Sequence, residues 1–232
     1  MALPIKGLQK TSLIDYPGKL ASVIFVGGCN FRCPFCHNSE LVLNPEKVPD
    51  IPEDEIIAFL KSRKEWVEGV VITGGEPTIH KELPYFIEKV KALGIPVKLD
   101  TNGTNNLMLR QMMNAGFLDY IAMDIKAPPE KYEDAAGVAG GMMDIKESIA
   151  DIMSSRVKYE FRTTVLPKLH TEADMMEIGK WLKGADKFVI QQFRPMTPID
   201  HSYKFEKPYP REKLDAMAEK LRPFFKRVEM RW

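Results

Sequence analysis

Residues 20–40, LASVIFVGGCNFRCPFCHNSE, join an apolar run of strand type to a loop that contains every cysteine of this 232-residue chain. The cysteines are Cys29, Cys33 and Cys36, so three thiols fall within eight residues. An iron–sulfur cube usually takes four cysteine thiolates, so three would leave one iron without a protein ligand. An open position of this kind is what a catalytic metal needs. We therefore interpret the stretch as a strand that leads into an iron–sulfur site.

The cysteine loop has three other interpretations. Residues 33–37, CPFCH, have the form of a haem-attachment site, but covalent haem is normally attached outside the cytoplasm, and the N-terminus lacks the apolar core of a secretory signal. Zinc would need a fourth ligand, and His37 adjoins Cys36 too closely to reach the same ion easily. A redox pair of Cys33 and Cys36 would leave Cys29 unexplained. The open iron–sulfur site is the interpretation that the residues favour.

The bulk composition is that of an ordinary soluble globular protein, with 44% hydrophobic residues, 28% charged residues and a net charge of +1. The near-neutral charge argues against general binding to nucleic acid or to a membrane surface. No stretch approaches the roughly 18 apolar residues of a membrane span. We expect a cytoplasmic protein, in which clustered thiols stay reduced.

Strand-like apolar runs alternate with amphipathic helical patterns along the chain. The predicted strands are residues 20–26, 69–73, 96–100, 120–125, 158–165 and 187–193. Apolar residues recur with the helical period in residues 81–93 and 142–153. Nearly continuous apolar strands that alternate with helices indicate a parallel sheet covered by helices. The predicted fold is α/β, a partial (β/α)6 barrel of TIM-like form.

No Gly/Ser linker or low-complexity tract marks a domain boundary, so we expect a single domain over residues 1–232. Within it we expect a lead-in with a turn (1–19), the β/α core (20–200), and a C-terminal helix with a short strand (201–232). Residues 128–141 read as a long loop, a candidate lid or partner-contacting segment.

Polar residues follow the carboxyl ends of the predicted strands, which is where parallel β/α folds build their sites. After the cysteine loop, the strand ends supply in turn Gly74-Gly75-Glu76, Asp100-Thr101-Asn102, Asp124-Ile125-Lys126, Arg162-Thr163-Thr164 and Gln191-Gln192. Taken singly, each group is explained by a turn, a helix cap or a surface ion pair. With the cysteine loop these make six strand ends, and together they indicate one site on one rim.

The motifs of this rim resemble those of a known family. CNFRCPFC (29–36) is the CxxxCxxC signature of radical S-adenosylmethionine (SAM) enzymes. TGGEP (73–77), DTNG (100–103) and MDIK (123–126) match further motifs of the glycyl-radical-enzyme activases in that superfamily. Residues 10–38 closely resemble activating proteins of anaerobic ribonucleoside-triphosphate reductase, and the resemblance covers roughly residues 6–200.

The resemblance implies a [4Fe–4S] cluster held by Cys29, Cys33 and Cys36, with SAM chelated to the iron that has no protein ligand. One-electron reduction would cleave SAM to methionine and a 5′-deoxyadenosyl radical, which would take a hydrogen atom from a glycine of a partner enzyme. The implied partner is anaerobic ribonucleotide reductase, and the implied electron donor is a flavodoxin or a ferredoxin. The alternative is a radical SAM enzyme that acts on a small molecule, such as a deazapurine-forming enzyme.

The same resemblance assigns the rim to SAM. The implied SAM-binding residues are Phe35, His37, Gly74, Gly75, Glu76, Asp100, Thr101, Asn102, Asp124, Ile125, Lys126, Arg162 and Gln192. The glycines and the Glu76 carboxylate would lie along the methionine part, Phe35 and His37 would frame the adenine, and Lys126 would face the carboxylate or the ribose.

A monovalent cation is a further implication. Asp100, Thr101 and Asp124 match a constellation that binds such a cation beside SAM in pyruvate formate-lyase activase, and their hard oxygens suit it. Where that activase has a histidine near the end of its last strand, this chain offers Gln192 or Phe193. To admit a partner's glycine, the rim would be open beside residues 128–141 and beside the residues after Phe193.

Overall fold

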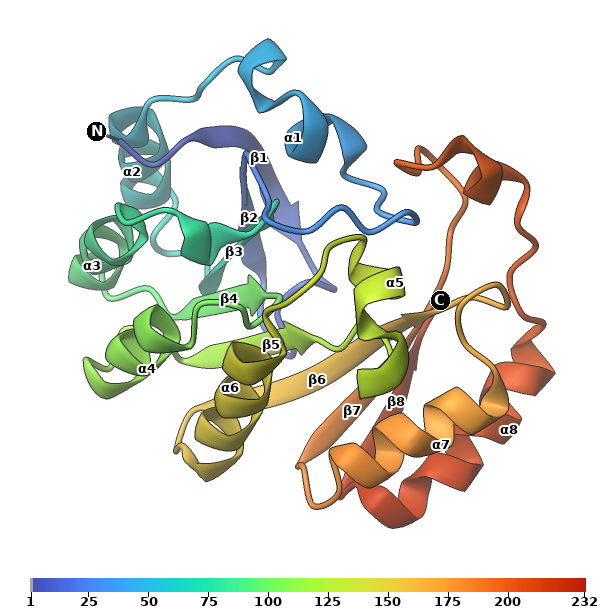
Figure 1. Cartoon of the computed structure of the whole chain (residues 1–232). Coiled ribbons are helices and arrows are strands. Elements are labelled where there is room, and N and C mark those ends of the chain that lie inside the picture. Colours follow the sequence, from blue (N-terminus) through green and yellow to red (C-terminus); the bar gives the residue numbers. More distant parts are fainter. Residues whose placement is uncertain (1) are drawn as a thin grey trace.

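A curved sheet of eight strands, with helices along its outer side, forms the framework of the computed structural model, which describes residues 2–232 (Figure 1). Six strands coincide with the predicted ones: β2 (Ala21–Val26), β3 (Gly69–Gly74), β4 (Val97–Thr101), β5 (Tyr120–Asp124), β6 (Lys158–Val165) and β7 (Lys187–Gln192). These six strands pair in chain order and are all parallel. The prediction of an α/β fold with a partial barrel is confirmed.

Two more strands lengthen the sheet at its ends. β1 (Ile5–Ser12) pairs antiparallel with β2, and β8 (Arg227–Arg231) pairs parallel with β7. The expectation that residues 1–19 are only a lead-in is therefore wrong. β1 was missed because most of its side chains are exposed or half-buried, so it lacks the apolar run of a central strand. β1 and β8 end the strand order, and the barrel stays open between them.

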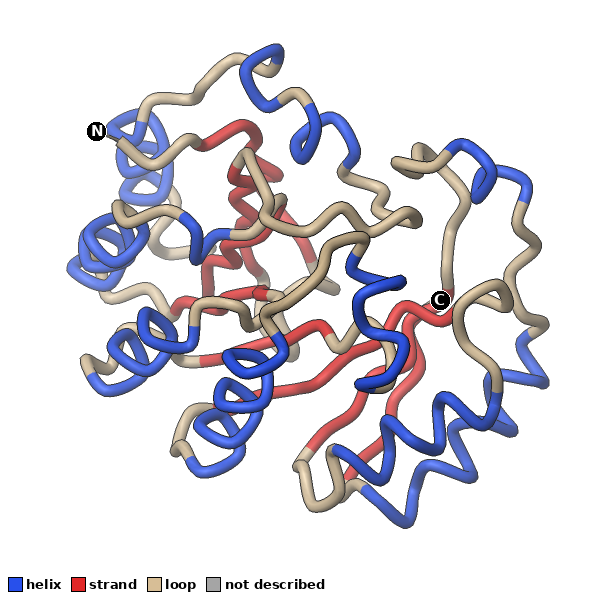
Figure 2. Tube along the Cα trace, in the orientation of Figure 1, coloured by secondary structure: helices blue, strands red, loops and turns tan. Residues whose placement is uncertain are grey.

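The main helices lie along the outer side of the sheet, as Figure 2 shows by secondary structure. They are α2 (Glu53–Ser62), α3 (Leu83–Ala92), α4 (Asn106–Asn114), α6 (Met142–Ser154), α7 (Glu172–Trp181) and α8 (Arg211–Leu221). In α3 the buried residues are Leu83, Phe86, Ile87 and Val90, which confirms the predicted periodicity. α7 begins with a capping box between Thr171 and Asp174. Among residues 2–232, no helix is long and apolar enough to cross a membrane.

Inside the barrel, a small apolar cluster lies toward the amino ends of the strands. It consists of Tyr16, Ala21, Val23, Val71 and Tyr120, and it is separate from the large core between sheet and helices. The Tyr16 and Tyr120 rings pack with centroids 5.9 Å apart. Tyr16 comes from the turn between β1 and β2, so the segment before the first predicted strand helps to close this end of the barrel. The opposite end of the barrel, at the carboxyl ends of the strands, is therefore the end available for a functional site.

Residues 128–141 are not the long loop that we expected. They contain a 3-10 turn (Pro129–Lys131) and a short helix, α5 (Tyr132–Ala136), which Figure 1 shows across the mouth of the barrel. The Arg32 N–H donates to the Ala136 carbonyl at 2.8 Å, and Tyr132 is only 1% exposed. The segment therefore supports the cysteine loop. A helix of five residues is too short to show a helical period in the sequence.

Candidate functional site

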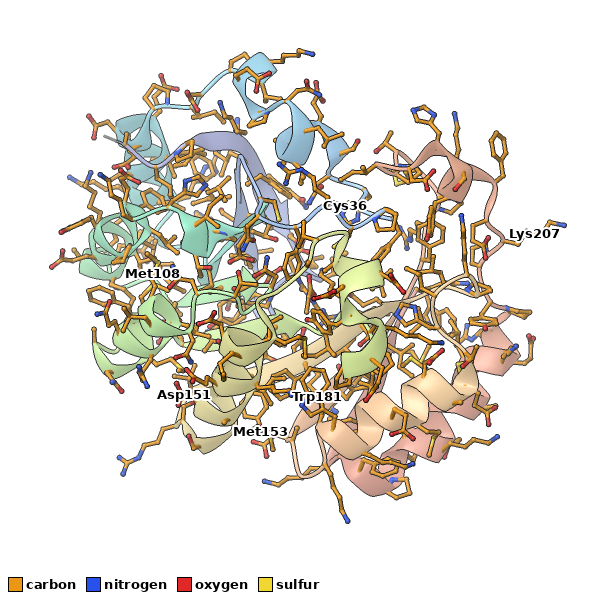
Figure 3. All side chains as sticks on the ribbon, viewed as in Figure 1. Cys36, Met108, Asp151, Met153, Trp181 and Lys207 are labelled. Atoms are coloured by element: carbon orange, nitrogen blue, oxygen red, sulfur yellow. The ribbon has the colours of Figure 1, made fainter. Side chains whose placement is uncertain are left out.

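A cavity of about 1110 Å³ opens at the carboxyl ends of the strands. It brings together almost all of the predicted site residues: Cys29, Cys33, Phe35, Cys36, His37, Gly74, Gly75, Glu76, Asp100, Thr101, Asn102, Asp124, Lys126, Arg162 and Gln192. In Figure 3, Cys36 lies at the mouth of the barrel, whereas Met108, Met153 and Trp181 lie on the outer helices.

Ile125 is the one predicted residue that does not line the cavity. Its side chain is fully buried in the core, its N–H donates to the Arg162 carbonyl, and its carbonyl accepts from Thr163 Oγ1. The assignment of Ile125 to SAM is therefore corrected, because its side chain points into the core and its backbone joins β5 to β6.

The three cysteines share one loop and face the same cavity. Cys33 is buried, whereas Cys29 and Cys36 are partly buried. Burial raises the pKa of Cys29 to about 12 and that of Cys33 to about 11. Because thiolates in such surroundings need a compensating cation, three soft ligands in one buried loop fit an iron–sulfur cluster. Within residues 2–232 no three His, Cys, Asp or Glu side chains already stand in a metal-binding arrangement, so the fit rests on donor type, spacing and the shared cavity.

The Gly74-Gly75 pair holds the cysteine loop by direct contact between two backbones. Gly75 N–H donates to the Val26 carbonyl at 2.8 Å, and Glu76 N–H donates to the Gly28 carbonyl at 2.8 Å. A Cβ on Gly75 would stand 1.8 Å from the Gly28 oxygen, and Gly74 has a φ of 112°. The close approach that these glycines permit is therefore one between the chain's own loops, although both glycines also line the cavity.

Glu76 is committed to bonds within the protein. It is 1% exposed, and its carboxylate accepts from the Thr78 N–H and hydroxyl, from the Thr101 hydroxyl at 2.8 Å and from the Asn102 N–H at 2.6 Å. These bonds join the loop after β3 to the end of β4. Glu76 thus fixes two neighbouring strand ends, and the expected contact of its carboxylate with the SAM amino group stays a prediction.

Five charged side chains form a continuous series of ion pairs inside the barrel, in the order Lys98, Asp100, Arg162, Asp124 and Lys126. Arg162 stands between the two carboxylates, with Nη1 3.0 Å from Asp100 Oδ2 and Nε donating to Asp124 Oδ1. Lys126 Nζ lies 2.9 Å from Asp124 Oδ2. Each carboxylate is therefore compensated by two cations.

This pairing decides which groups are charged. Burial alone would raise the pKa of Asp124, but Arg162 and Lys126 hold it well below its usual range. Burial would lower the pKa of Lys126, but Asp124 raises it well above the ordinary value. Lys126 thus presents a permanent positive charge to the cavity beside the cysteines, which suits a carboxylate ligand.

The structure adds two buried charges that the sequence analysis missed. Lys98 is 1% exposed and pairs with Asp100. Glu160 is fully buried and lies 3.1 Å from Lys187 Nζ and 2.8 Å from Arg231 Nη2. The sequence could have indicated both residues, since each lies inside a predicted buried strand. A charged residue in such a strand needs a partner of opposite charge.

The residues after β7 reach across to the cysteine loop. The Thr197 hydroxyl donates to the His37 carbonyl at 2.9 Å, and Asp200 N–H donates to the Pro34 carbonyl at 2.9 Å. Gln192 lines the cavity, and its amide donates to the Tyr209 carbonyl at 3.0 Å. The expected opening beside residues 128–141 is wrong, because α5 lies there and none of these residues lines the cavity. Beside the residues after Phe193 the cavity stays open, since Arg194 and Met196 line it and are exposed.

Together these features define a class: a partial parallel β/α barrel that carries a three-thiol loop and a charged cavity of about 1110 Å³ at the carboxyl ends of its strands. The family model described as the radical SAM superfamily matches residues 23–182. The chain belongs to the radical SAM superfamily. Membership implies a [4Fe–4S] cluster and SAM as the cofactors.

Three known proteins show which members of the superfamily this chain resembles. A Methanocaldococcus jannaschii protein, provisionally named as a glycyl-radical enzyme activating enzyme, is 36% identical over 90% of this chain and 87% of its own length. A Halobacterium salinarum 7-carboxy-7-deazaguanine synthase is 37% identical over 44% of this chain and 40% of its own length. Streptococcus suis SuiB, solved with its precursor peptide SuiA, superposes with a TM-score of 0.71 at 15% identity, covering 89% of this chain and 48% of SuiB. The likeness to SuiB concerns the fold alone.

Proposed function

We propose that this protein is a radical SAM activase that generates a glycyl radical on a partner enzyme. The observation that carries the proposal is the three-thiol loop on a charged cavity, in a chain that matches an activating-enzyme relative over nine-tenths of its length. When bound, the reduced cluster would supply one electron to SAM, giving methionine and a 5′-deoxyadenosyl radical, which takes one hydrogen atom from the partner's glycine.

The chain's own residues bind and orient the cofactors. Cys29, Cys33 and Cys36 are the cluster ligands in this proposal. Lys126, held in place by Asp124, would bind the SAM carboxylate, since a charge-assisted bond is strongest where water is excluded. Phe35 is 7% exposed and, with His37, would form the wall for the adenine.

The experiment is anaerobic reconstitution followed by mixing with SAM, a reductant and candidate glycyl-radical enzymes. We expect roughly four irons per chain and a glycyl signal in electron paramagnetic resonance with one of the candidates. Cys33→Ala should abolish both the signal and 5′-deoxyadenosine formation. Stoichiometric zinc, or full activity of Cys33→Ala, would refute the cluster assignment.

The partner in this proposal is anaerobic ribonucleotide reductase, and the electron donor is a flavodoxin or a ferredoxin, in the cytoplasm. The support is the similarity of residues 10–38 to activating proteins of that reductase. Parallel assays with this reductase and with other glycyl-radical enzymes test the choice. A radical that forms only on another enzyme would overturn the choice of partner and leave the activase function intact.

The second candidate function is catalysis on a small molecule. The observation in its favour is the size and charge of the cavity, which extends past the rim to Lys187, Arg227 and Glu229. The partial identity to 7-carboxy-7-deazaguanine synthase points the same way. Rapid 5′-deoxyadenosine formation with a small metabolite, and no protein radical, would favour this function.

The site proposed for a monovalent cation at Asp100, Thr101 and Asp124 already contains a positively charged side chain. Arg162 already bridges the two carboxylates, so an added ion would have to displace it. If Arg162 serves as the cation, SAM affinity should be equal in sodium, potassium and choline chloride. A loss of affinity in choline chloride would support the added ion.

A further inference from the structure

His80 lies directly behind the start of the cysteine loop. It ends the 3-10 turn Pro77–Ile79, which follows β3, and its side chain is half-buried. Its Nε2 lies 2.7 Å from the Gly27 carbonyl oxygen. Because a carbonyl oxygen can only accept, we assign the ring hydrogen to Nε2, and His80 donates this bond. His80 does not line the cofactor cavity, so it can act on the cofactors only through the loop.

Two glycines, Gly27 and Gly28, connect β2 to Cys29. A Cβ on Gly27 would stand 2.9 Å from Pro45 Cβ, and Gly28 has a φ of 82°, which other residues rarely adopt. Glycine is therefore favoured at both positions, although it restricts the backbone less than any other residue. Contacts from outside the loop must fix the direction in which the chain reaches Cys29.

Hydrogen bonds to three neighbouring segments supply these contacts. The Gly27 N–H donates to the Pro4 carbonyl at 3.0 Å, and the Gly28 N–H donates to the Leu41 carbonyl at 2.7 Å. His80 holds the Gly27 carbonyl. The peptide group between the two glycines is therefore bonded at both its oxygen and its N–H. Since its oxygen is held by a side chain, one substitution can release it and leave the backbone bonds in place.

A second cavity, of about 510 Å³, lies beside this contact. His80, Gly27 and Gly28 are among its lining residues, together with Lys6 and Pro45. Cavities of about 150 Å³ in proteins already admit benzene, so this one can admit imidazole where the His80 ring has been removed. The donor at His80 can thus be both deleted and supplied again from solution.

We propose that His80 is a positioning residue for the proposed cluster site. By donating from Nε2 to the Gly27 carbonyl, it fixes the peptide group between the two glycines and, through it, the place of Cys29 relative to the other two thiols. The inference goes beyond the activase function, because it holds whichever substrate receives the radical.

Hydrogen exchange of the metal-free protein tests the contact itself. His80→Phe keeps a ring and removes the donor, whereas His80→Gln keeps a side-chain N–H. In His80→Phe, exchange in residues 27–36 should be up to about tenfold faster than in the parent, the upper range for one hydrogen bond. In His80→Gln it should stay near the parental rate. His201→Phe is the control, because its exposed side chain lines neither cavity.

Imidazole separates the loss of the donor from the loss of the ring's bulk. In metal-free His80→Gly, exchange in residues 27–36 should be as fast as in His80→Phe, and added imidazole should slow it toward the parental rate. The same imidazole should leave His80→Phe unchanged, because the phenyl ring occupies the place that imidazole would take.

The reconstituted protein supplies a second readout. Every variant keeps Cys29, Cys33 and Cys36, so iron content should stay near that of the parent. The electron paramagnetic resonance spectrum of the reduced cluster should change in His80→Phe and stay parental in His80→Gln, because only the first substitution releases the entry to Cys29. An unchanged spectrum in His80→Phe would contradict the positioning role.

Two exchange results would also overturn the inference. The first is equal exchange in the parent and in His80→Phe. The second is fast exchange in all three His80 variants that imidazole does not slow, since the donor would then not be the cause. Failure to find a protein substrate leaves these results interpretable, because the exchange experiments need neither cluster nor partner.

Discussion

At the scale of single residues, the rim is held together by contacts within the protein. Glu76, Asp100 and Asp124 were predicted as SAM-binding residues from the family resemblance, and each is also bonded to neighbouring strand ends. Gly75 shows the same dual use, because it lines the cavity and touches the Gly28 backbone. In the proposed SAM site, the residues that would bind the cofactor are thus the same ones that fix the loop geometry.

Gly75→Ala should prevent the cysteine loop from assembling. Its Cβ would stand 1.8 Å from the Gly28 oxygen, so the two loops must separate. We expect iron after reconstitution to fall below about one quarter of the roughly four ions of the parent. Gly7→Ala on β1, whose nearest contact would be 3.4 Å, is the control and should load normally. Normal iron content in Gly75→Ala would show that this packing is not required.

His170 should make stability depend on pH. Its Nδ1 accepts from Leu166 N–H and its Nε2 donates to the Lys126 carbonyl, so the ring is neutral, and burial lowers its pKa. Below about pH 6.5, His170 binds a proton in the unfolded chain but not in the native protein. The free energy of unfolding therefore falls as pH falls. The loss of stability should be measurable between pH 7 and pH 5.5, where the unfolded histidine takes up its proton.

Denaturant unfolding of His170→Gln over the same pH range checks this assignment. The variant should show a smaller loss between pH 7 and pH 5.5 than the parent. Equal slopes would mean that another group, such as His37, whose pKa is also lowered by desolvation, carries the effect.

At the scale of elements, the structure changes the role of residues 128–141. The sequence analysis predicted most of the β/α units, because long apolar runs and helical periods are strong signals. It did not predict α5, whose five residues show no period and whose fold depends on the cysteine loop. It also did not identify the pairing of Lys98 with Asp100, because partners depend on strand register and side-chain direction.

Gly137→Ala should impair the cluster rather than partner binding alone. Gly137 has a φ of 68°, and a Cβ there would stand 2.1 Å from the Arg32 oxygen within the cysteine loop. Gly140 has a similar φ of 88° with nothing within 4 Å, so Gly140→Ala controls for backbone strain. Iron content and partner-free SAM cleavage should fall only in Gly137→Ala. If iron content and SAM cleavage fall equally in the two variants, α5 does not support the cysteine loop.

At the scale of the whole molecule, the open sheet joins the cofactor site to the outside. β1 has half-exposed residues and gave a weak sequence signal, whereas β8 matches the short C-terminal strand that we expected. Residues of β8 and of the turn after β1 line the cavity. The fold class and the rim could be predicted from the sequence, whereas the position of the opening could not. It depends on where the sheet ends and on which loops cross the mouth.

Transfer of deuterium from the partner's glycine to 5′-deoxyadenosine tests the central claim most directly. The glycyl-radical enzyme is produced with α-deuterated glycine and mixed with reconstituted protein, SAM and reductant. The account predicts one deuterium in the 5′-deoxyadenosine of each activating event and a matching glycyl radical. 5′-Deoxyadenosine without deuterium, formed while no protein radical appears, would contradict the account.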